Sequence, residues 1–556
     1  MKSITFKPDN ITIQVKKGQT ILEAARKAGI AIESPCNGSG VCGKCRINRE
    51  QIDNIDALLI KKSVFSENND DDSYILACNA CINEDVIVEL TNNKESDLKI
   101  LSKGKIFAFE KKTLVKKEYY EKEDITKIYY NEKEIAFEKG NTKNENYGIV
   151  IDIGTTTMVA SLVDLNTGKE LTSESVLNPQ AIHAQDVLSR ITMAHEQKGM
   201  ELLYTEVVKE FNNLIDMIAK NKGVDPNGIY EIILSGNTCM IHLATNKNPT
   251  SLGEYPYEPA IQGGSYEAAK LHGLHLAKEA VLYLPPIISS YVGPDITSGV
   301  LATQIYKRKD NSLLVDIGTN GEMVISKNGD LSATSTAAGP AFEGMNIEFG
   351  MRAAKGAIEM FEIEDDDTIT VKTIENAPPV GICGSGLMDI VGELVSHKVI
   401  TKSGKFANPK RNELPDFLSE RLEKKNGKTV FKLSEDVYLT QKDVRQVQLA
   451  KGAVRAGIEF LLKSQELTAD KLDEVMIAGS FGYHLRTKSL INIGLLPKEF
   501  EDKVDFVGNT SKTGGQAFLM NKKYRNEMEE LVKTINIVEL SNYDNFEEVF
   551  VKCLNF

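Results

Sequence analysis

The chain has 556 residues, 41% of them hydrophobic, so it is long enough for roughly three or four domains that each bury a core. Its 79 acidic and 66 basic side chains give a formal net charge of −13. The acidic balance argues against general affinity for nucleic acid or anionic membranes, and no run of about 18 apolar residues is present to span a bilayer. Because the first residues, MKSITFKPDN, lack the apolar core of a signal peptide, we expect a cytoplasmic globular protein that works with protein partners.

The first predicted elements are two short strands, SITF and ITIQV, on either side of the turn KPDN. Apolar runs of this length that are bounded by turn residues are typical of strands. A helix, ILEAARKAG, is expected to follow, with Thr20 as its N-cap and Gly29 at its end. This lead-in runs directly into a segment rich in cysteine and glycine, PCNGSGVCGKCRI.

Five of the eight cysteines fall between residues 36 and 81. Cys36, Cys42 and Cys45 are separated by five and two residues, and Cys78 follows after 32 more. A [2Fe-2S] cluster needs four ligands, and the glycines of this segment let the backbone wrap closely around an inorganic core. We therefore predict that these four cysteines hold a [2Fe-2S] cluster. Five residues separate Cys36 from Cys42, whereas the plant-type spacing has four. In this respect residues 1–92 resemble the adrenodoxin-like ferredoxins, and the resemblance implies a β-grasp domain.

Two alternatives stay open for these cysteines. Cys42, Cys45, Cys78 and Cys81 also form two Cys-x-x-Cys pairs, which is the spacing of a structural zinc site. Zinc would leave Cys36 without a role and would not require the glycine-rich loop, so the cluster is the favoured interpretation. Cys81 is then not expected to be a ligand, although it could exchange with Cys78 in the fourth position.

Residues 93–146 are rich in Lys, Glu and Asn, as in KKTLVKKEYYEKED, and contain only short apolar groups such as KIFAF. This composition is typical of a solvated connector. We predict a charged linker with a little structure. Its functional alternative is a tether that lets the first domain move between an electron donor and an electron acceptor.

An internal repeat opens the remaining part of the chain. YGIVIDIGTTTMVASLVDLNTGKEL begins near 147 and SLLVDIGTNGEMVISKNGDLSA begins near 312, and both are predicted as strand, Gly-Thr turn, strand, turn, strand. Asp152 and Asp316 each end an apolar strand, where a carboxylate can hold hydrated magnesium or the attacking water. Each Gly-Thr turn offers backbone amides and a hydroxyl to phosphate oxygens. One such turn could close an ordinary hairpin, but two with the same following pattern indicate a phosphate site.

A third element, EVMIAGSFG at 474–482, is predicted as a buried strand that enters a glycine loop. These three elements, in this order, resemble the superfamily of acetate and sugar kinases, heat-shock chaperones and actin. The resemblance implies two ribonuclease-H-like halves, 147–310 and 311–556, with ATP in the cleft between them, and it matches Asp152 and Asp316 to the magnesium and water positions. The matching phosphate and adenosine positions are Gly154, Thr155, Thr156, Gly318, Thr319, Asn320, Gly479, Ser480, Phe481 and Gly482.

Further segments narrow the family. Four of them resemble the reductive activators of corrinoid proteins, and the likeness extends along the whole chain: GNTCMIHL, AAGPAFEGMNIEFGMRAAKGAIE, GICGSGLMD and TQKDVRQVQLAKGAVRAGIEFLL. The second segment contains Glu343, which could orient water or magnesium near the second phosphate loop. The fourth is predicted to be an amphipathic helix from the spacing of its apolar residues. The expected fold class is multidomain, α+β and α/β, with a β-grasp ferredoxin-like domain, a linker and a duplicated ribonuclease-H-like ATPase domain.

The resemblance also implies a function. Methyl-carrying corrinoid proteins cycle through cobalt(I), and oxidation to cobalt(II) removes them from turnover. Plant-type ferredoxin clusters have reduction potentials of about −400 mV, which is above that of the cobalt couple, so returning the electron requires ATP. We therefore expect an ATP-hydrolysing electron-transfer activase with a [2Fe-2S] cluster, ATP and Mg²⁺. Its expected partners are a corrinoid protein of a methyltransferase system and a separate low-potential reductant; the sequence leaves the oligomeric state open and allows a homodimer.

Three other functions remain open. The ATP-driven electron donors of 2-hydroxyacyl-CoA dehydratases hold a [4Fe-4S] cluster between two subunits, but only Cys239 and Cys383 could serve here. Both of these, and Cys553, are expected to be small buried apolar residues. A redox-sensing switch protein would use the cluster and the ATP cleft without productive electron transfer. A chaperone-like ATPase is disfavoured because no substrate-binding β-domain follows the ATP domain.

Overall fold

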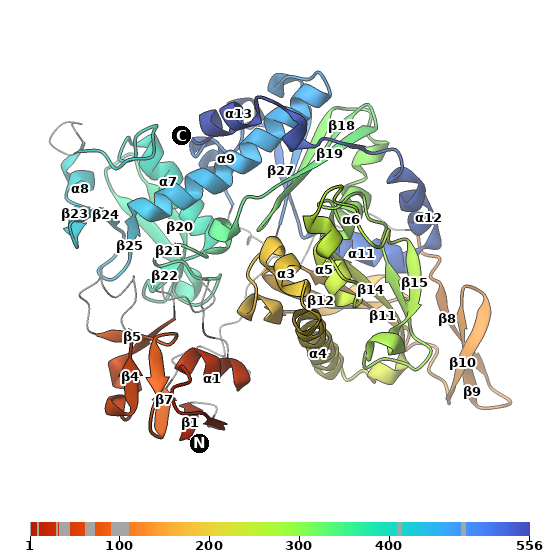
Figure 1. The fold of residues 1–556 in the computed structure, drawn as a ribbon. Helices are drawn as coiled ribbons and strands as arrows, with labels where there is room; N and C mark the ends of the chain where they lie inside the picture. Colours follow the sequence, from red (N-terminus) through yellow and green to blue (C-terminus); the bar gives the residue numbers. More distant parts are fainter. Residues whose placement is uncertain are drawn as a thin grey trace. The chain divides into compact units, whose positions relative to one another are not determined.

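The computed structural model divides the chain into two compact units, of which the first contains residues 1–97 and the second nearly all of the rest. The residues that the structure describes are 2–7, 10–28, 30, 32, 45–61, 73–89, 110–408, 414–479 and 485–556 (Figure 1). The boundary predicted at residue 92 lies outside them. In the described part of the chain, no helix is both long and apolar enough to cross a membrane.

The first unit contains a mixed three-stranded sheet. In spatial order its strands are β2 (Ile11–Val15), β1 (Lys2–Lys7) and β7 (Val86–Glu89). β2 is antiparallel and β7 parallel to β1. Helix α1 (Ile21–Lys27) begins after Thr20, whose hydroxyl accepts the N–H of Glu23 at 3.1 Å, while the Glu23 carboxylate accepts the N–H of Thr20 at 3.1 Å. This capping box confirms the predicted N-cap.

Two short antiparallel strand pairs complete the first unit. They are β3 (Arg46–Asn48) with β5 (Tyr74–Leu76), and β4 (Leu58–Ile60) with β6 (Ala80–Ile82). Ile4 and Phe6 of β1, Leu22 of α1 and Val88 of β7 form the core with residues from these pairs. The described part of this unit, for which a ferredoxin-like fold was expected, therefore has a hydrophobic core of its own.

The predicted linker is wrong for residues 115–139, which fold as an antiparallel sheet (Figure 1). Its strands are β8 (Val115–Tyr120), β9 (Ile125–Tyr130) and β10 (Lys133–Lys139). Val115 and Ile128 are fully buried and join the core of the ATPase domain. Charged side chains alternate with apolar ones along these strands, so the average composition is polar although one face of the sheet is apolar.

A buried ion pair attaches this sheet to the ATPase domain. Arg525 lies in helix α12 (Lys522–Leu531) and donates to Glu231 Oε1 at 2.7 Å, and both side chains are fully buried. Tyr130 of β9 donates its hydroxyl to the same oxygen at 2.9 Å. The Arg525 guanidinium also lies 4.4 Å from the centre of the Tyr283 ring. The pair therefore joins three separate parts of the chain.

We predict that Glu231→Gln lowers the free energy of unfolding of the ATPase domain by about 3–5 kcal/mol, because it leaves the Arg525 charge buried without a carboxylate. Urea denaturation followed by circular dichroism measures this loss. The matched control is Glu530→Gln, whose ion pair with Lys533 is exposed and should contribute about 1 kcal/mol or less. Equal losses in the two variants would contradict the prediction.

The first half of the ATPase domain contains a six-stranded sheet. In spatial order its strands are β13 (Lys169–Leu177), β12 (Thr157–Asp164), β11 (Tyr147–Ile153), β14 (Ile229–Gly236), β16 (Val281–Leu284) and β15 (Ser265–Ala268). β11, β12 and β13 form an antiparallel meander, and β14 and β16 run parallel to β11. Its helices are α3 (Val187–Ala194), α4 (Gln197–Lys222), α5 (Thr238–Ala244) and α6 (Pro294–Thr303). The predicted strand and turn pattern after residue 147 is confirmed.

The second half repeats this arrangement. Its main sheet contains β27 (Val504–Gly508), β26 (Glu474–Ala478), β17 (Ser312–Ile317), β18 (Gly321–Lys327), β19 (Asp330–Thr336) and β28 (Asn536–Ile537). β17, β18 and β19 form the antiparallel meander, and β26 and β27 run parallel to β17. The meander and the two parallel strands beside it recur in both halves, which confirms the duplicated ribonuclease-H-like fold, while the sixth strands, β15 and β28, lie at opposite edges of the two sheets.

Smaller elements surround the second sheet. Two three-stranded sheets contain β20 (Ala357–Ile363), β21 (Ile369–Thr373) and β22 (Gly381–Ile382), then β23 (Leu422–Lys425), β24 (Lys428–Lys432) and β25 (Tyr438–Thr440). The helices are α7 (Gly384–Ser396), α8 (Asp416–Ser419), α9 (Gln441–Ser464), α10 (Thr487–Asn492) and α13 (Phe546–Cys553). In α9, Val447, Val454 and Ile458 are fully buried, so the predicted amphipathic helix is confirmed.

Helix α11 (Thr510–Met520) returns the chain to the first half, so the predicted range 311–556 does not form one half by itself. Phe518 and Leu519 are buried in the core beneath β11 and β14. Helices α11 and α6 cross very closely, because a Cβ at Gly514 would lie 2.1 Å from the carbonyl oxygen of Ser298. The prediction placed the boundary at the start of the repeated pattern, which carries no information about this later crossing.

Candidate functional site

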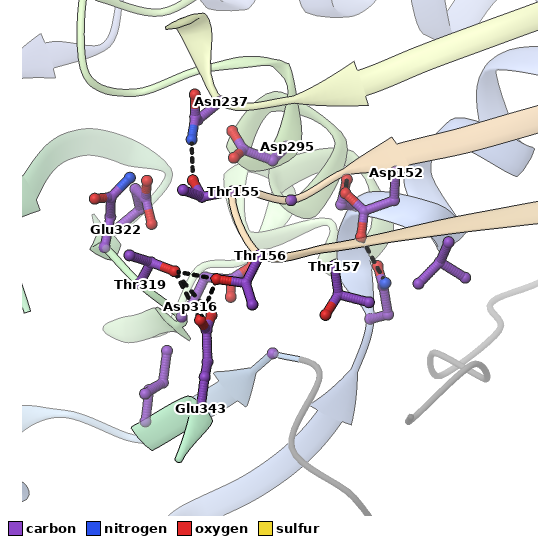
Figure 2. A pocket seen from close by; sticks show the side chains of 18 residues that line it. Asp152, Thr155, Thr156, Thr157, Asn237, Asp295, Asp316, Thr319, Glu322 and Glu343 are labelled. Atoms are coloured by element: carbon purple, nitrogen blue, oxygen red, sulfur yellow. Dashed lines mark hydrogen bonds between the residues drawn. The ribbon is translucent and has the colours of Figure 1, made fainter. Parts of the chain in front are cut away.

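The turns that follow β11 and β17 line one cavity of about 100 Å³ in the ATPase domain (Figure 2). Many of the predicted nucleotide-site residues line it: Asp152, Gly154, Thr155, Thr156, Asp316, Gly318, Thr319, Asn320, Glu343 and Gly479. Ser480, Phe481 and Gly482 lie outside the described residues. The structure therefore brings together the two Gly-Thr turns, which the sequence separates by more than 150 residues.

The first Gly-Thr turn is held from behind by three polar side chains. Asn178 donates to the carbonyl oxygen of Gly154 at 2.9 Å, and the fully buried Arg190 donates to that of Thr155 at 2.5 Å. Asn237 donates its amide to the Thr155 hydroxyl at 3.1 Å (Figure 2). These bonds fix the turn, so its free groups keep a defined direction into the cavity.

Asp152 is positioned by the start of helix α11. Its two carboxylate oxygens accept hydrogen bonds from Asn509 Nδ2 and from the Ser511 hydroxyl, each at 2.7 Å. Burial raises the pKa of Asp152, and these two donors oppose that shift. These two hydrogen bonds therefore orient the Asp152 side chain.

A group of carboxyl side chains gathers at the second turn. Burial and the charge of Asp152 raise the pKa of Asp316 to about 7. Burial and the charge of Asp316 raise the pKa of Asp295, at the start of α6, to about 8. Burial also raises the pKa of Glu322, on β18, well above its usual value. Mg²⁺ in nucleotide sites is usually held by one or two carboxylates together with phosphates and water, so these side chains can contribute to a magnesium site although no three of them are placed to hold a metal ion by themselves.

Asp295, Glu322 and the side chains that hold Asp152 were not predicted from the sequence. Asp295 follows a Gly-Pro pair that begins α6, which is a helix-start signal with an acidic residue in the first turn. Glu322 is the second residue of β18, the strand after the second turn, and its neighbours Met323 and Val324 are buried as well, so no alternation singles it out. The helix-start signal at Asp295 is the same as that of an ordinary helix.

Glu343 connects the two turns. It ends a short 3-10 helix, and its carboxylate accepts hydrogen bonds from the hydroxyls of Thr156 and Thr319, the latter at 2.9 Å (Figure 2). The two hydroxyls lie 3.2 Å apart. Burial raises the pKa of Glu343, and both hydroxyls oppose that shift. The structure places Glu343 at the cavity as expected, and its role with water or magnesium stays a prediction.

We predict that Mg²⁺·ADP binding tightens as the pH rises from about 6.5 to about 8.5. Below their raised pKa values Asp316 and Asp295 are protonated, so a metal ion must displace protons, and each proton released gives about a tenfold change in affinity per pH unit. Calorimetric titration measures the affinity and, in buffers of different ionisation enthalpy, the number of protons. ADP without Mg²⁺ is the control and should depend less on pH; a flat Mg²⁺·ADP profile would contradict the prediction.

The described part of the cluster segment contains two of the four predicted ligands. Cys45 and Cys78 are both buried, and the N–H of Ala77 donates to the carbonyl oxygen of Cys45 at 2.7 Å, which ties the two cysteine-bearing segments together. Cys36 and Cys42 lie outside the described residues. Among the described residues no three Cys, His, Asp or Glu side chains are placed to hold a metal ion. Two buried, adjacent thiol-bearing segments nevertheless fit the soft donors that an iron–sulfur cluster requires.

Cys81 lies three residues beyond Cys78, within strand β6. Its backbone pairs with Leu59 of β4 and forms a bridge with Thr20, and its side chain is almost fully buried. Cys78 instead lies in the turn before this strand. A turn can adapt to a cluster more easily than a paired strand, which favours Cys78 over Cys81 as the fourth ligand.

The remaining cysteines lie in the ATPase domain. Cys239 and Cys383 are buried as expected, and burial raises the pKa of Cys239 to about 12. Cys383 packs with Ala357 and Ile374 in a separate apolar cluster. Cys553 is only half-buried. Since Cys239 and Cys383 are buried thiols in different cores, they are poorly placed to hold a cluster at a subunit surface.

Family models match three parts of the chain. A 2Fe-2S iron-sulfur cluster binding domain matches residues 4–83, the RACo middle region matches 147–308, and the C-terminal domain of RACo, the ASKHA domain, matches 310–556. The region between the first two matches contains the β8–β10 sheet. The matched order is that expected from the sequence, with an iron–sulfur domain ahead of an ATPase domain.

Proteins of known activity are similar over most of the chain. The corrinoid activation enzyme RamQ of Eubacterium limosum is 29% identical over 97% of this chain and 96% of its own. The [Co(II) methylated amine-specific corrinoid protein] reductase of Methanosarcina barkeri is 23% identical over 70% of this chain and 73% of its own. A solved structure, the reductive activator for corrinoid, iron-sulfur protein, is 29% identical with a TM-score of 0.74 and covers 100% of this chain and 98% of that one.

Proposed function

Because the chain belongs to the family of reductive activators of corrinoid proteins, we propose that it uses ATP to return the cobalt(II) of a corrinoid protein to cobalt(I) by transfer of one electron. One observation carries this proposal: a single chain joins a [2Fe-2S] domain to an ATPase domain whose two phosphate turns meet in one cavity. A kinase would have no use for the first domain, and a simple electron carrier would have none for the second.

In the ATPase domain, the two Gly-Thr turns would bind the phosphates through their amides and hydroxyls. Asp152 and Asp316 would hold Mg²⁺, which neutralises phosphate charge when it is bound. Glu343 accepts from Thr156 and Thr319, the hydroxyls that a terminal phosphate would need. Its carboxylate would have to release them, and it would then be free to orient water or a metal-bound water. Gly479 to Gly482 would receive the adenosine.

In the first unit, Cys36, Cys42, Cys45 and Cys78 are the proposed cluster ligands. The bound cluster supplies one low-potential electron. Cys45 and Cys78 are buried, so the cluster would lie in surroundings of low polarity. Such surroundings disfavour the additional negative charge of the reduced cluster and help to keep its reduction potential low. A separate low-potential reductant would load the cluster.

The acceptor in this proposal is the corrinoid protein of a methyltransferase system, and the reaction takes place in the cytoplasm. ATP would favour a state of the complex in which electron transfer is possible. Each tenfold increase in the population of that state needs about 1.4 kcal/mol. A homodimer would give twice the 61.4 kDa of the chain in light scattering.

The function is tested by mixing the cluster-reconstituted protein with a cobalt(II) methyl-carrier corrinoid protein and a strong reductant, and by following the cobalt(I) absorption band. We expect the band to form with MgATP and to be much weaker without nucleotide. If cobalt(I) forms equally with and without ATP, the proposed coupling is wrong. A preparation that contains zinc and lacks visible absorption would remove the electron donor from the proposal.

A further inference from the structure

An exposed aromatic loop at residues 254–258 is linked to the first phosphate turn through other segments of the ATPase domain. Tyr255 is 88% exposed and Tyr257 is 44% exposed. The ring of Tyr257 lies 6.1 Å from that of Tyr255 and 6.4 Å from that of Tyr291, measured between centres. Tyrosine combines a large apolar ring with a polar end, and it is enriched at the centres of protein interfaces. Two exposed tyrosines on one loop, with the partly buried Tyr291 of a second segment beside them, therefore indicate a surface that binds a protein.

Hydrogen bonds hold this loop in an uncommon backbone conformation. Tyr257 has a φ of +63°, which is rare for a bulky side chain. Its N–H donates to the carbonyl oxygen of Glu254 at 2.6 Å, and its own carbonyl accepts from the Ser290 hydroxyl. The Tyr291 hydroxyl donates to the carbonyl oxygen of Leu252 at 2.6 Å. Strained residues that polar bonds hold in place are concentrated at binding sites.

The segment 289–293, which contacts the tyrosine loop through Ser290, also contacts Thr238, the neighbour of a residue that holds the phosphate turn. Ser289, next to Ser290, accepts a hydrogen bond at its carbonyl from the Thr238 hydroxyl at 2.7 Å. Asn237 precedes Thr238 and donates to the Thr155 hydroxyl at 3.1 Å (Figure 2). Gly293 lies directly against this pair, because a Cβ there would be 2.5 Å from the Thr238 nitrogen. A displacement of residues 289–293 would therefore move a donor of the phosphate turn.

We propose that the loop of Tyr255 and Tyr257, with Tyr291 packed beside it, is the surface of the ATPase domain on which the corrinoid protein docks, and that its docking is coupled to the phosphate turn through Ser289 and Asn237. This inference rests on the proposed function, which requires that the nucleotide state and the affinity for the acceptor depend on each other. Glu254 and Glu258 flank the tyrosines, so the complementary surface has an apolar centre and basic groups at its rim.

The test compares steady-state cobalt(I) formation by cluster-reconstituted wild type and by Tyr255→Ala/Tyr257→Ala. The KM for the cobalt(II) corrinoid protein should rise about tenfold or more in the variant, while the cluster spectrum and ATP hydrolysis without a partner stay at wild-type levels. Phe137→Ala is the matched control, because Phe137 is an aromatic residue of β10 that is 70% exposed; it should leave the KM unchanged. A wild-type KM in the double variant would overturn the proposal.

A second variant tests the coupling separately. Ser290→Ala removes the hydroxyl that bonds to Tyr257 and leaves the tyrosines in place. We expect it to reduce the stimulation of ATP hydrolysis by the corrinoid protein several-fold, whereas unchanged stimulation would overturn the coupling. If the tyrosine substitutions changed the molecular mass measured by light scattering but not the KM, the surface would bind a second copy of this chain. The assigned partner would then be wrong. Failure of the proposed function would differ from all of these outcomes, since wild type would then form no ATP-dependent cobalt(I).

Discussion

Replacement of Asp316 by asparagine should reduce ATP hydrolysis by about a hundredfold or more. Asp316 lies where the second phosphate turn begins, and its carboxyl faces the cavity that Asp152, Asp295 and Glu343 also line. A metal ion that neutralises phosphate charge contributes several kcal/mol to phosphoryl transfer, and each 1.4 kcal/mol is worth about a factor of ten in rate. An asparagine keeps the shape of the side chain but has no charge with which to hold the ion. Release of inorganic phosphate at saturating MgATP measures the effect.

The matched control for this variant is Asp330→Asn. Asp330 begins β19 in the same half of the domain, but its side chain is exposed and does not line the cavity. Hydrolysis by the control should stay within about twofold of wild type, since surface substitutions away from such sites have small effects. Hydrolysis by Asp316→Asn at the wild-type rate would remove Asp316 from the proposed magnesium site. Urea denaturation followed by circular dichroism, unchanged in both variants, shows that the ATPase domain remains folded.

Replacement of Cys78 by serine should abolish the [2Fe-2S] absorption and cobalt(I) formation while ATP hydrolysis continues. A serine hydroxyl is a harder and much less acidic donor than a thiolate, so the cluster loses one of its four ligands. The iron content and visible spectrum after anaerobic reconstitution measure the loss. ATP hydrolysis is an internal check, because the phosphate turns lie in the separate ATPase domain.

Cys81→Ser is the matched control for the cluster variant, only three residues further along the chain. Cys81 lies within a paired strand, and a serine there should leave the full iron content and spectrum. The opposite pattern, with the cluster lost in Cys81→Ser and retained in Cys78→Ser, would assign the fourth position to Cys81. Loss of the cluster in both variants would indicate that the fold of this turn depends on both thiols.

The sequence predicts those parts of the fold that depend on local patterns. Thr20 as an N-cap, the two Gly-Thr hairpins and the amphipathic α9 each leave a signal within a few residues, because capping, turn geometry and helical periodicity are short-range effects. The duplicated hairpins also predicted that Asp152 and Asp316 occupy equivalent positions. Their meeting in one cavity followed from the resemblance to a superfamily and not from spacing alone.

Features that depend on contacts between distant segments were missed. The β8–β10 sheet has a polar composition because only one of its faces is buried, and Arg525 of α12, far along the chain, pairs with Glu231 beside it. Helix α11 returns to the first half and packs closely on α6 at Gly514. No local sequence pattern predicts this contact. Asp295 becomes part of the candidate site because α6 begins at the cavity that the second turn also lines, and its helix-start signal is the same as that of any other helix.

The central claim is that ATP drives one electron from this chain into the cobalt of a corrinoid protein, and a single-turnover measurement tests it most directly. The protein is reduced at its cluster, excess reductant is removed, and the sample is mixed rapidly with cobalt(II) corrinoid protein with or without MgATP. With MgATP, we predict that the absorption of the oxidised cluster returns and the cobalt(I) band grows at the same rate, with one cobalt(I) formed per cluster. Equal amplitudes and rates without ATP, or ATP hydrolysis with no cobalt(I), would contradict the claim.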